Sequence, residues 1–252
     1  MSFNVLLIGD SCIDVYRTGS VDRLSPEAPV PVLKNVDETH LPGMAANVKI
    51  NLEKFDVTVD FITNTSLITK TRYIDKRSGQ QLLRVDNEPE TISWNQTYNS
   101  INYDALVISD YNKGFLTYEH IKHCIKNFKC PIFIDTKKTD LRQFDAANVM
   151  IKINEVEYNQ CTSIPDHLIV TKGSEGAMLK RLNEEVLIPT KPVAVTDVCG
   201  CGDTFLAALT YSFILTKKLK ESIIFANRAA GITAQQRGNY APSLEEVINA
   251  GN

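Results

Sequence analysis

The stretch VTDVCGCGDTF, from Val195 to Phe205, joins the end of an extended segment to a long apolar helix. Its glycines at 200 and 202 flank a single residue, so successive backbone N–H groups can converge on an anion beside a helix N-terminus. Asp203 follows directly. A carboxylate beside an anion site is suited to take a proton from a hydroxyl that attacks a phosphoryl group. The alternative is an ordinary acidic residue in the first turn of a helix.

The composition describes an ordinary globular chain and excludes some partners. The 252 residues are 43% hydrophobic and 23% charged, which is enough for a substantial core. A net charge of -3 gives no basic excess, so we expect no nucleic-acid partner. The first nine residues lack the basic start of a signal peptide, and no apolar run reaches the length of a membrane span. We therefore expect no membrane partner.

The six cysteines do not follow the spacing of a disulfide framework or of a zinc site. This pattern is typical of reduced thiols, so we expect a cytoplasmic protein.

Short apolar runs alternate with helical patterns along the chain. The expected strands are 3–9, 57–63, 105–109, 131–135, 149–153 and 168–171, and the expected helices are 45–55, 117–128, 204–215, 219–237 and 243–250. This alternation predicts an α/β fold with a mostly parallel sheet and right-handed crossovers.

Two sections interrupt the alternation. Residues 15–41 are extended and rich in proline, and residues 71–86 contain a hairpin signal at Ser78-Gly79. We expect the two sections to pair as a small β lid over a substrate, within a single domain that spans residues 1–252. The open strand edges of such a lid predict a homodimer joined lid to lid.

Polar side chains follow several of the expected strands. Because ligands bind at the carboxyl ends of parallel strands, these residues predict a crevice at one edge of the sheet. Any one of them could instead cap its own loop. The residues are Asp10, Asp14, Asp110, Asp135, Asn154 and Thr171.

These features resemble the PfkB, or ribokinase-like, carbohydrate kinases over nearly the whole chain. The run from Asp197 to Asp203 is similar to the family signature D-x-x-G-A-G-D. The resemblance implies a three-layer sandwich in which Asp203 is the catalytic base and Gly200, Cys201 and Gly202 form the anion hole.

Further motifs of the resemblance divide into a sugar side and a nucleotide side. On the sugar side, the run 42–47 is similar to the N-terminal signature, which implies that Gly43 and Asn47 bind sugar hydroxyls together with Asp14. On the nucleotide side, Asn154 and Glu157 match an N-x-x-E motif that organises Mg²⁺, through water, and phosphate. ATP is the implied phosphoryl donor. The residues implied to bind it are Asn154, Glu157, Thr171, Gly173, Gly176, Asn227 and Gly231.

One branch of the family resembles the chain most: the kinases of D-glycero-D-manno-heptose 7-phosphate in lipopolysaccharide-precursor synthesis. Three runs are similar to theirs, at 23–32, 80–86 and 109–114. The resemblance implies phosphorylation of the anomeric hydroxyl to give the 1,7-bisphosphate. The residues that it implies on the substrate side are Arg23, Arg84, Asp110 and Lys113. A kinase of another sugar or nucleoside is an alternative, as is a catalytically weak protein that binds sugar or nucleotide.

The chain also departs from the family pattern. Met44 stands where the family has a second glycine, and Cys199 and Cys201 replace the usual Thr and Ala. The segment between Thr63 and Thr71 lacks a whole helix–strand unit, and the segment between Glu157 and Leu168 lacks most of a helix. We therefore expect a trimmed protein that carries a kinase domain without the nucleotidyltransferase domain fused to some relatives.

Overall fold

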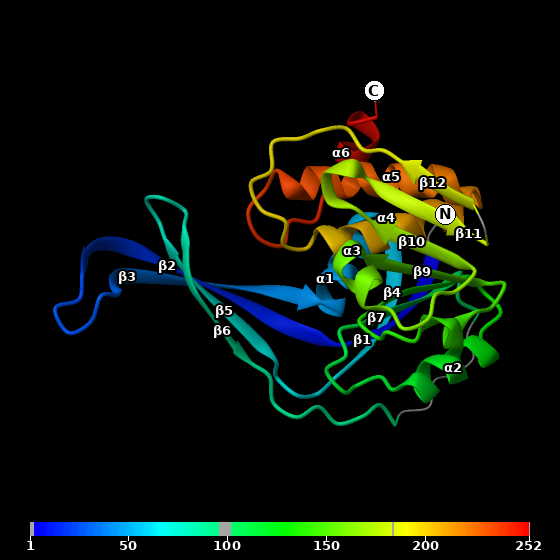
Figure 1. The fold of residues 1–252 in the computed structure, drawn as a ribbon, viewed down its shortest axis with the longest axis horizontal. Helices are drawn as coiled ribbons and strands as arrows, with labels where there is room; N and C mark the ends of the chain where they lie inside the picture. Colours follow the sequence, from blue (N-terminus) through cyan, green and yellow to red (C-terminus); the bar gives the residue numbers. More distant parts are fainter. Residues whose placement is uncertain (1–2, 96–101, 183, 252) are drawn as a thin grey trace.

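The computed structural model of the protein describes residues 3–95, 102–182 and 184–251, and these residues form two separate sheets (Figure 1). The larger has eight strands in the order β12-β11-β10-β9-β8-β7-β1-β4. Pairing is parallel from β4 to β10, as expected, and antiparallel for β11 and β12. Its strands are β1 (Phe3–Gly9), β4 (Val57–Thr63), β7 (Ala105–Asp110), β8 (Ile132–Thr136), β9 (Val149–Asn154), β10 (His167–Thr171), β11 (Ala177–Arg181) and β12 (Glu184–Ile188).

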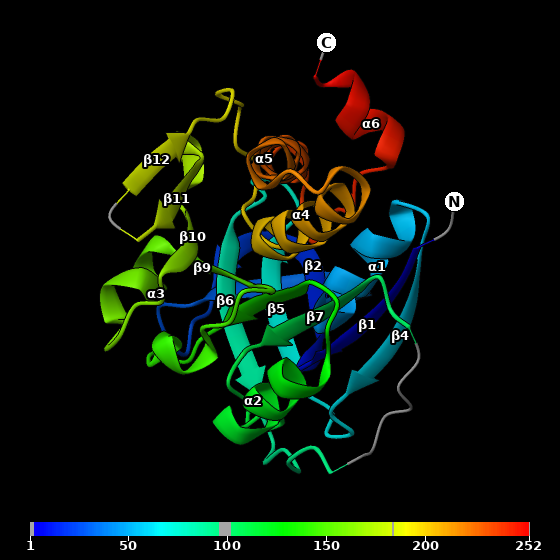
Figure 2. The same cartoon turned by 90° about the vertical axis from the view of Figure 1, so that its right-hand side faces the viewer.

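Helices cover both faces of the large sheet, so the fold is a three-layer sandwich. In β1, Val5 and Leu7 point into one core and Leu6 and Ile8 into the other, because successive side chains of a strand alternate in direction. Figure 2 shows α4 and α5 on one side of this sheet and α2 on the other. The helices are α1 (Ala45–Lys54), α2 (Tyr118–Asn127), α3 (Glu155–Gln160), α4 (Cys201–Thr216), α5 (Leu219–Ala234) and α6 (Leu244–Asn249).

The smaller sheet is the expected lid, which extends away from the body in Figure 1. It consists of β2 (Ser11–Leu24), β3 (Pro31–Met44), β5 (Thr69–Asp75) and β6 (Gln81–Asn87), in the order β3-β2-β5-β6. The strand registers align Asp14 with Lys70, and Arg72 with both Tyr16 and Arg84. Since residues paired across strands share a face, these charged side chains all lie on one face of the lid.

Two connections are as short as the sequence predicts. β4 ends at Thr63 and β5 begins at Thr69, and no helix or strand lies between them. α3 has only six residues. A cavity of about 400 Å³ lies beside the first of these connections, lined by residues that include Ile13, Pro42, Asn64 and Leu67. In the part of the chain that the structure describes, no helix is long and apolar enough to cross a membrane.

Candidate active site

Asp203 lies in the first turn of α4, where the polar contacts of the site converge. The residue is 4% exposed, and its carboxylate accepts hydrogen bonds from Nδ2 of Asn47 (2.9 Å) and from the hydroxyl of Tyr111 (2.7 Å). Burial raises the pKa of Asp203 to about 6, although the two hydrogen bonds oppose the change. A buried carboxylate whose pKa lies near neutrality is suited to act as a general base.

Gly200 makes the approach of this loop to α1 possible. Its φ of +76° is in the left-handed region, which glycine adopts without a side-chain clash. A Cβ at this position would lie 2.8 Å from Nδ2 of Asn47, the same nitrogen that donates to Asp203. A side chain at residue 200 would therefore displace a partner of Asp203.

A buried cation lies beside the same loop. Nζ of Lys152, on β9, donates to Oδ2 of Asp135 (2.7 Å) and to the carbonyl oxygen of Gly202 (3.3 Å). The contact with Gly202 ties the ammonium to the expected anion hole. The ion pair with Asp135 offsets much of the charge of Lys152, so its main effect here is to hold the loop at Gly202.

Five of the seven expected nucleotide residues line one cavity of about 260 Å³, whereas Asn154 and Glu157 line a separate one. Residues from three segments line the first cavity, including Thr171, Gly173, Gly176, Cys201, Gly202, Asn227 and Gly231. Nδ2 of Asn227 donates to the carbonyl oxygen of Ile188 (3.0 Å), which holds α5 against the end of β12. Val193 and Phe205 add apolar walls, as expected for a pocket that takes a flat base.

Asn154 and Glu157 hold each other at the start of α3. Oδ1 of Asn154 accepts from the backbone N–H of Glu157 (2.8 Å), and Oε2 of Glu157 accepts from that of Asn154 (2.9 Å). Oε1 of Glu157 pairs with Lys137 (2.7 Å). The described residues contain no group of three or more His, Cys, Asp or Glu placed to hold a metal. The amide and carboxylate oxygens of Asn154 and Glu157 are of the kind that binds magnesium together with water ligands.

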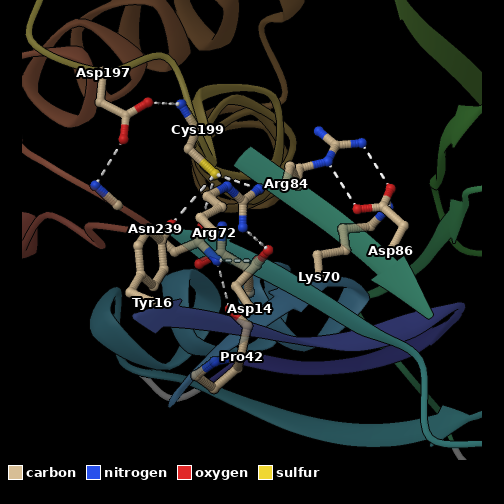
Figure 3. Close-up of polar contacts among 12 residues, drawn as sticks. Asp14, Tyr16, Pro42, Lys70, Arg72, Arg84, Asp86, Asp197, Cys199 and Asn239 are labelled. Carbon is tan, nitrogen blue, oxygen red and sulfur yellow. Dashed lines mark hydrogen bonds and ion pairs between the residues drawn. The ribbon is translucent and has the colours of Figure 1, made fainter. Parts of the chain in front are cut away.

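The lid is tied to the body through Asp14 (Figure 3). Asp14 accepts from Nη1 of Arg72 and from Nδ2 of Asn239 (2.7 Å). Arg72 also reaches Sγ of Cys199 (3.7 Å), in the loop before α4. A Cβ on Gly43 would lie 2.2 Å from Oδ2 of Asp14. The absence of a side chain at residue 43 thus leaves room for this carboxylate.

Further cations lie along the same face of the lid. Arg84 donates to both oxygens of Asp86 through Nε (2.8 Å) and Nη2 (2.7 Å), as Figure 3 shows, and its side chain is 48% exposed. Lys70 pairs with Glu88 (3.1 Å), which also binds Lys113 (2.6 Å). Arg84 and Lys113 are therefore linked by ion pairs to the face of the lid that carries Asp14.

Two of the expected substrate residues are not at this site. Arg23 is exposed and lies nine residues beyond Asp14 on β2, which is about 30 Å along an extended strand. Asp110 is buried and accepts from Oγ1 of Thr136 (2.5 Å), while its ion pair with Lys138 measures 3.1 Å. Its carboxylate thus secures the neighbouring strand and loop instead of facing the sugar side. Four residues at the site were not predicted to act there: Arg72, Tyr111, Lys152 and Asn239.

Comparison with known proteins identifies the family. Residues 64–246 match the family model described as "pfkB family carbohydrate kinase". The chain belongs to the PfkB family. The description of this family names carbohydrate kinases, a chemistry that the geometry of Asp203 and the nucleotide cavity would suit.

The similar curated proteins are longer than this chain. It is 32% identical over 302 residues to the bifunctional protein HldE of Nitratiruptor sp., covering 98% of this chain and 64% of that protein. It is 30% identical over 305 residues to the bifunctional protein HldE of Proteus mirabilis, covering 98% and 63%. The chain thus spans less than two thirds of these PfkB relatives. Both alignments are longer than the 252 residues of this chain, so the relatives carry extra segments within the matched region.

Solved structures share the ribokinase-like fold at low sequence identity. Ribokinase from Thermotoga maritima superposes with a TM-score of 0.72 at 18% identity, covering 98% of this chain and 99% of that one. Phosphofructokinase-2 from Escherichia coli gives 0.73 at 14%, covering 99% and 98%. Ribokinase from Arabidopsis thaliana, solved with ribose and ATP, gives 0.71 at 15%, covering 99% of both chains.

Proposed function

We propose that this PfkB kinase transfers the γ-phosphoryl group of ATP to the anomeric hydroxyl of D-glycero-D-manno-heptose 7-phosphate, giving the 1,7-bisphosphate. The observation that carries the proposal is the position of Asp203. Its turn of α4 also supplies Cys201 and Gly202 to the nucleotide cavity, and its partner Asn47 belongs to the helix that follows the lid. This position suits a base that acts between a nucleotide and a sugar.

In the proposed reaction, Asp203 takes the proton of the anomeric hydroxyl as its oxygen forms a bond to the γ-phosphorus. The bond from that phosphorus to the bridging oxygen of ADP breaks, and ADP leaves with the electron pair. Backbone N–H groups of residues 200–202 receive the negative charge of the transferred group, beside the Lys152 ammonium. Asn154 and Glu157 would hold a magnesium ion through water, and the ion would neutralise part of the phosphate charge.

The lid supports a substrate that carries a phosphate. Arg84 presents two adjacent N–H groups to a carboxylate, and the same geometry suits a phosphate. Its half-exposed side chain and the nearby Lys113 could bind the 7-phosphate, at the end of the sugar remote from the reacting hydroxyl. A charge-assisted contact of about 1.5–3 kcal/mol corresponds to a preference of about 10- to 150-fold.

The test is a comparison of initial rates of ADP formation with the heptose 7-phosphate, fructose 6-phosphate and ribose. We expect the heptose phosphate to be preferred, and Arg84→Ala to reduce that preference more than Arg23→Ala, because Arg23 lies far along the lid. Comparable rates on all three sugars would reject the heptose assignment and leave the kinase assignment standing. ATP binding without turnover on any sugar would instead support a protein that binds its ligands with little catalysis.

We also propose a homodimer joined through the lid. The outer strands β3 and β6 each pair on one side only, so each leaves a free edge among the described residues. Leu83 and Val85 of β6 are about half exposed. Edge strands with exposed apolar side chains pair readily with another chain. Sedimentation velocity at micromolar concentration should give a dimer, and a monomer would count against the proposal.

A further inference from the structure

Tyr111 is a partly buried residue at the site that the proposed reaction does not yet use. It follows β7, and its hydroxyl donates to Oδ1 of Asp203 at 2.7 Å. Its backbone N–H donates to Oδ2 of Asp10 at 2.8 Å, and Asp10 is fully buried at the end of β1. Both the backbone and the hydroxyl of Tyr111 are therefore fixed by carboxylates.

The ring of Tyr111 is fixed as well. It packs against a buried cluster that includes Cys12 and Met44, and the ammonium of Lys137 lies 5.2 Å from its centre. Burial raises the pKa of the Tyr111 hydroxyl well above its ordinary value. The hydroxyl thus keeps its proton at neutral pH and remains a donor.

The contact leaves Asp203 free to act on a substrate. A carboxylate offers about four acceptor positions, and Asn47 and Tyr111 use two of them. The remaining positions are available to a sugar hydroxyl. Tyr111 fixes the direction of Oδ1 without taking the proton that the reaction must move.

We propose that Tyr111 is a positioning residue for phosphoryl transfer: its hydroxyl orients Oδ1 of Asp203 and holds that carboxylate in the ionised form that can accept a proton. The inference rests on the proposed function because Asp203 is its base. During transfer the proton of the sugar hydroxyl passes to Asp203, and Tyr111 keeps its own.

The electrostatic surroundings explain why such a donor matters. Without water, a buried carboxylate favours its neutral form, whereas hydrogen bonds to the anion oppose this. Asp135 also disfavours the charge on Asp203, and Lys152 favours it. The titratable groups that face Asp203 come from several elements: Cys12 on β2, Tyr111 after β7, Asp135 on β8, Lys152 on β9 and Cys201 on α4.

The first test is the pH profile of kcat/KM for Tyr111→Phe, which removes the hydroxyl and keeps the ring. The parent profile should fall on the acid side near pH 6, because the base must be ionised. In the variant this acid limb should move up by about one pH unit, so activity near pH 5 falls about tenfold while that near pH 8 changes little. The KM for ATP should not change.

Tyr103→Phe is the matched control, because the Tyr103 hydroxyl also donates to a carboxylate, Oδ2 of Asp60, at 2.7 Å outside the site. It should leave the profile in place. An acid limb that stays where it is in Tyr111→Phe, or an equal loss of activity at every pH, would overturn the inference. A thermal melt of each variant separates loss of folding from loss of orientation.

The second test does not depend on turnover. The chain has nine tyrosines, and the Tyr111 signal in protein labelled with ¹³Cζ-tyrosine is identified by its loss in Tyr111→Phe. It should titrate with an apparent pKa near 6 in the parent and not in Asp203→Asn. A Tyr111 chemical shift that stays constant between about pH 4 and 8 would overturn the inference. If the signal titrates but the protein phosphorylates none of the sugars, the coupling of Tyr111 to Asp203 stands and the proposed function is rejected.

Discussion

The nucleotide cavity and the inner face of the lid are built from different kinds of residue. Glycines, small residues and apolar walls on the body line the cavity, so much of what it offers a ligand is backbone and shape. The lid face consists of charged side chains held by one another, as in the Asp14–Arg72 and Arg84–Asp86 pairs. A site made of backbone tolerates changes of side chain, whereas a site made of ion pairs does not. We infer that the identity of the sugar is set on the lid.

Asp203→Asn should have the largest effect, because this residue serves both regions. The amide keeps the shape of the side chain and loses its basicity, so kcat should fall by about 10²-fold or more. The KM for each substrate should change little, and calorimetry should show nearly unchanged ATP binding. Asp60→Asn, which alters a carboxylate outside the site, is the control. Near-parental turnover would remove Asp203 from the role of base.

Asp14→Ala should act on the lid side alone. It removes the carboxylate that accepts from Arg72 and Asn239, and it leaves the Arg72 side chain, 12% exposed, without that partner. Asp14 is also expected to bind a sugar hydroxyl, and loss of that charge-assisted contact would raise the KM for the sugar about 10- to 150-fold, with little change for ATP. Asp37→Ala, on an exposed carboxylate of β3, should change neither constant. A larger change in the KM for ATP would show that the two sides are inverted.

Asn227→Ala should give the smallest effect, on the nucleotide side. The variant loses the hydrogen bond to Ile188 that holds α5 to the end of β12. A loss of about 1 kcal/mol corresponds to an increase of about fivefold in the KM for ATP, with the sugar constant unchanged. Asn249→Ala on α6, an exposed asparagine outside the cavity, serves as the control. Equal changes in the KM for ATP and the KM for the sugar would show that the two regions do not act separately.

The difference between the nucleotide cavity and the lid also explains which parts of the site could be predicted from the sequence. The nucleotide side follows from short motifs, since Thr171, Gly173 and Gly176 are close in the chain and their backbone defines the loop. The lid contacts are not local: Asn239 is 225 positions from Asp14, and Tyr111 is 92 positions from Asp203. No pattern of apolar residues or glycines indicates which distant side chains will meet.

A residue's place in a motif also does not show which way its side chain points. Arg23 and Asp110 belong to runs that resemble substrate elements, yet one lies far along β2 and the other is used by Thr136 and Lys138.

Most of the parallel sheet was predictable because its strands are buried on both faces and read as apolar runs. The strands β11 and β12 were missed. They lie at one side of the sheet, and charged residues such as Arg181 and Glu184 interrupt the apolar pattern there. The short helix α3 was missed as well, because its six residues contain no apolar periodicity.

One residue, Asp10, separates β1 of the body from β2 of the lid. Its backbone is fastened on both sides, to the carbonyl oxygen of Ser109 and to the N–H of Ala45. Measured along β2 from Asp10, Asp14 lies about 13 Å away and Arg23 about 43 Å away. A rotation of about 10° would move the first by about 2 Å and the second by about 7 Å. If a ligand turned the lid about Asp10, a label at the distal end would move about three times as far as Asp14, so that end is the place to detect the turn.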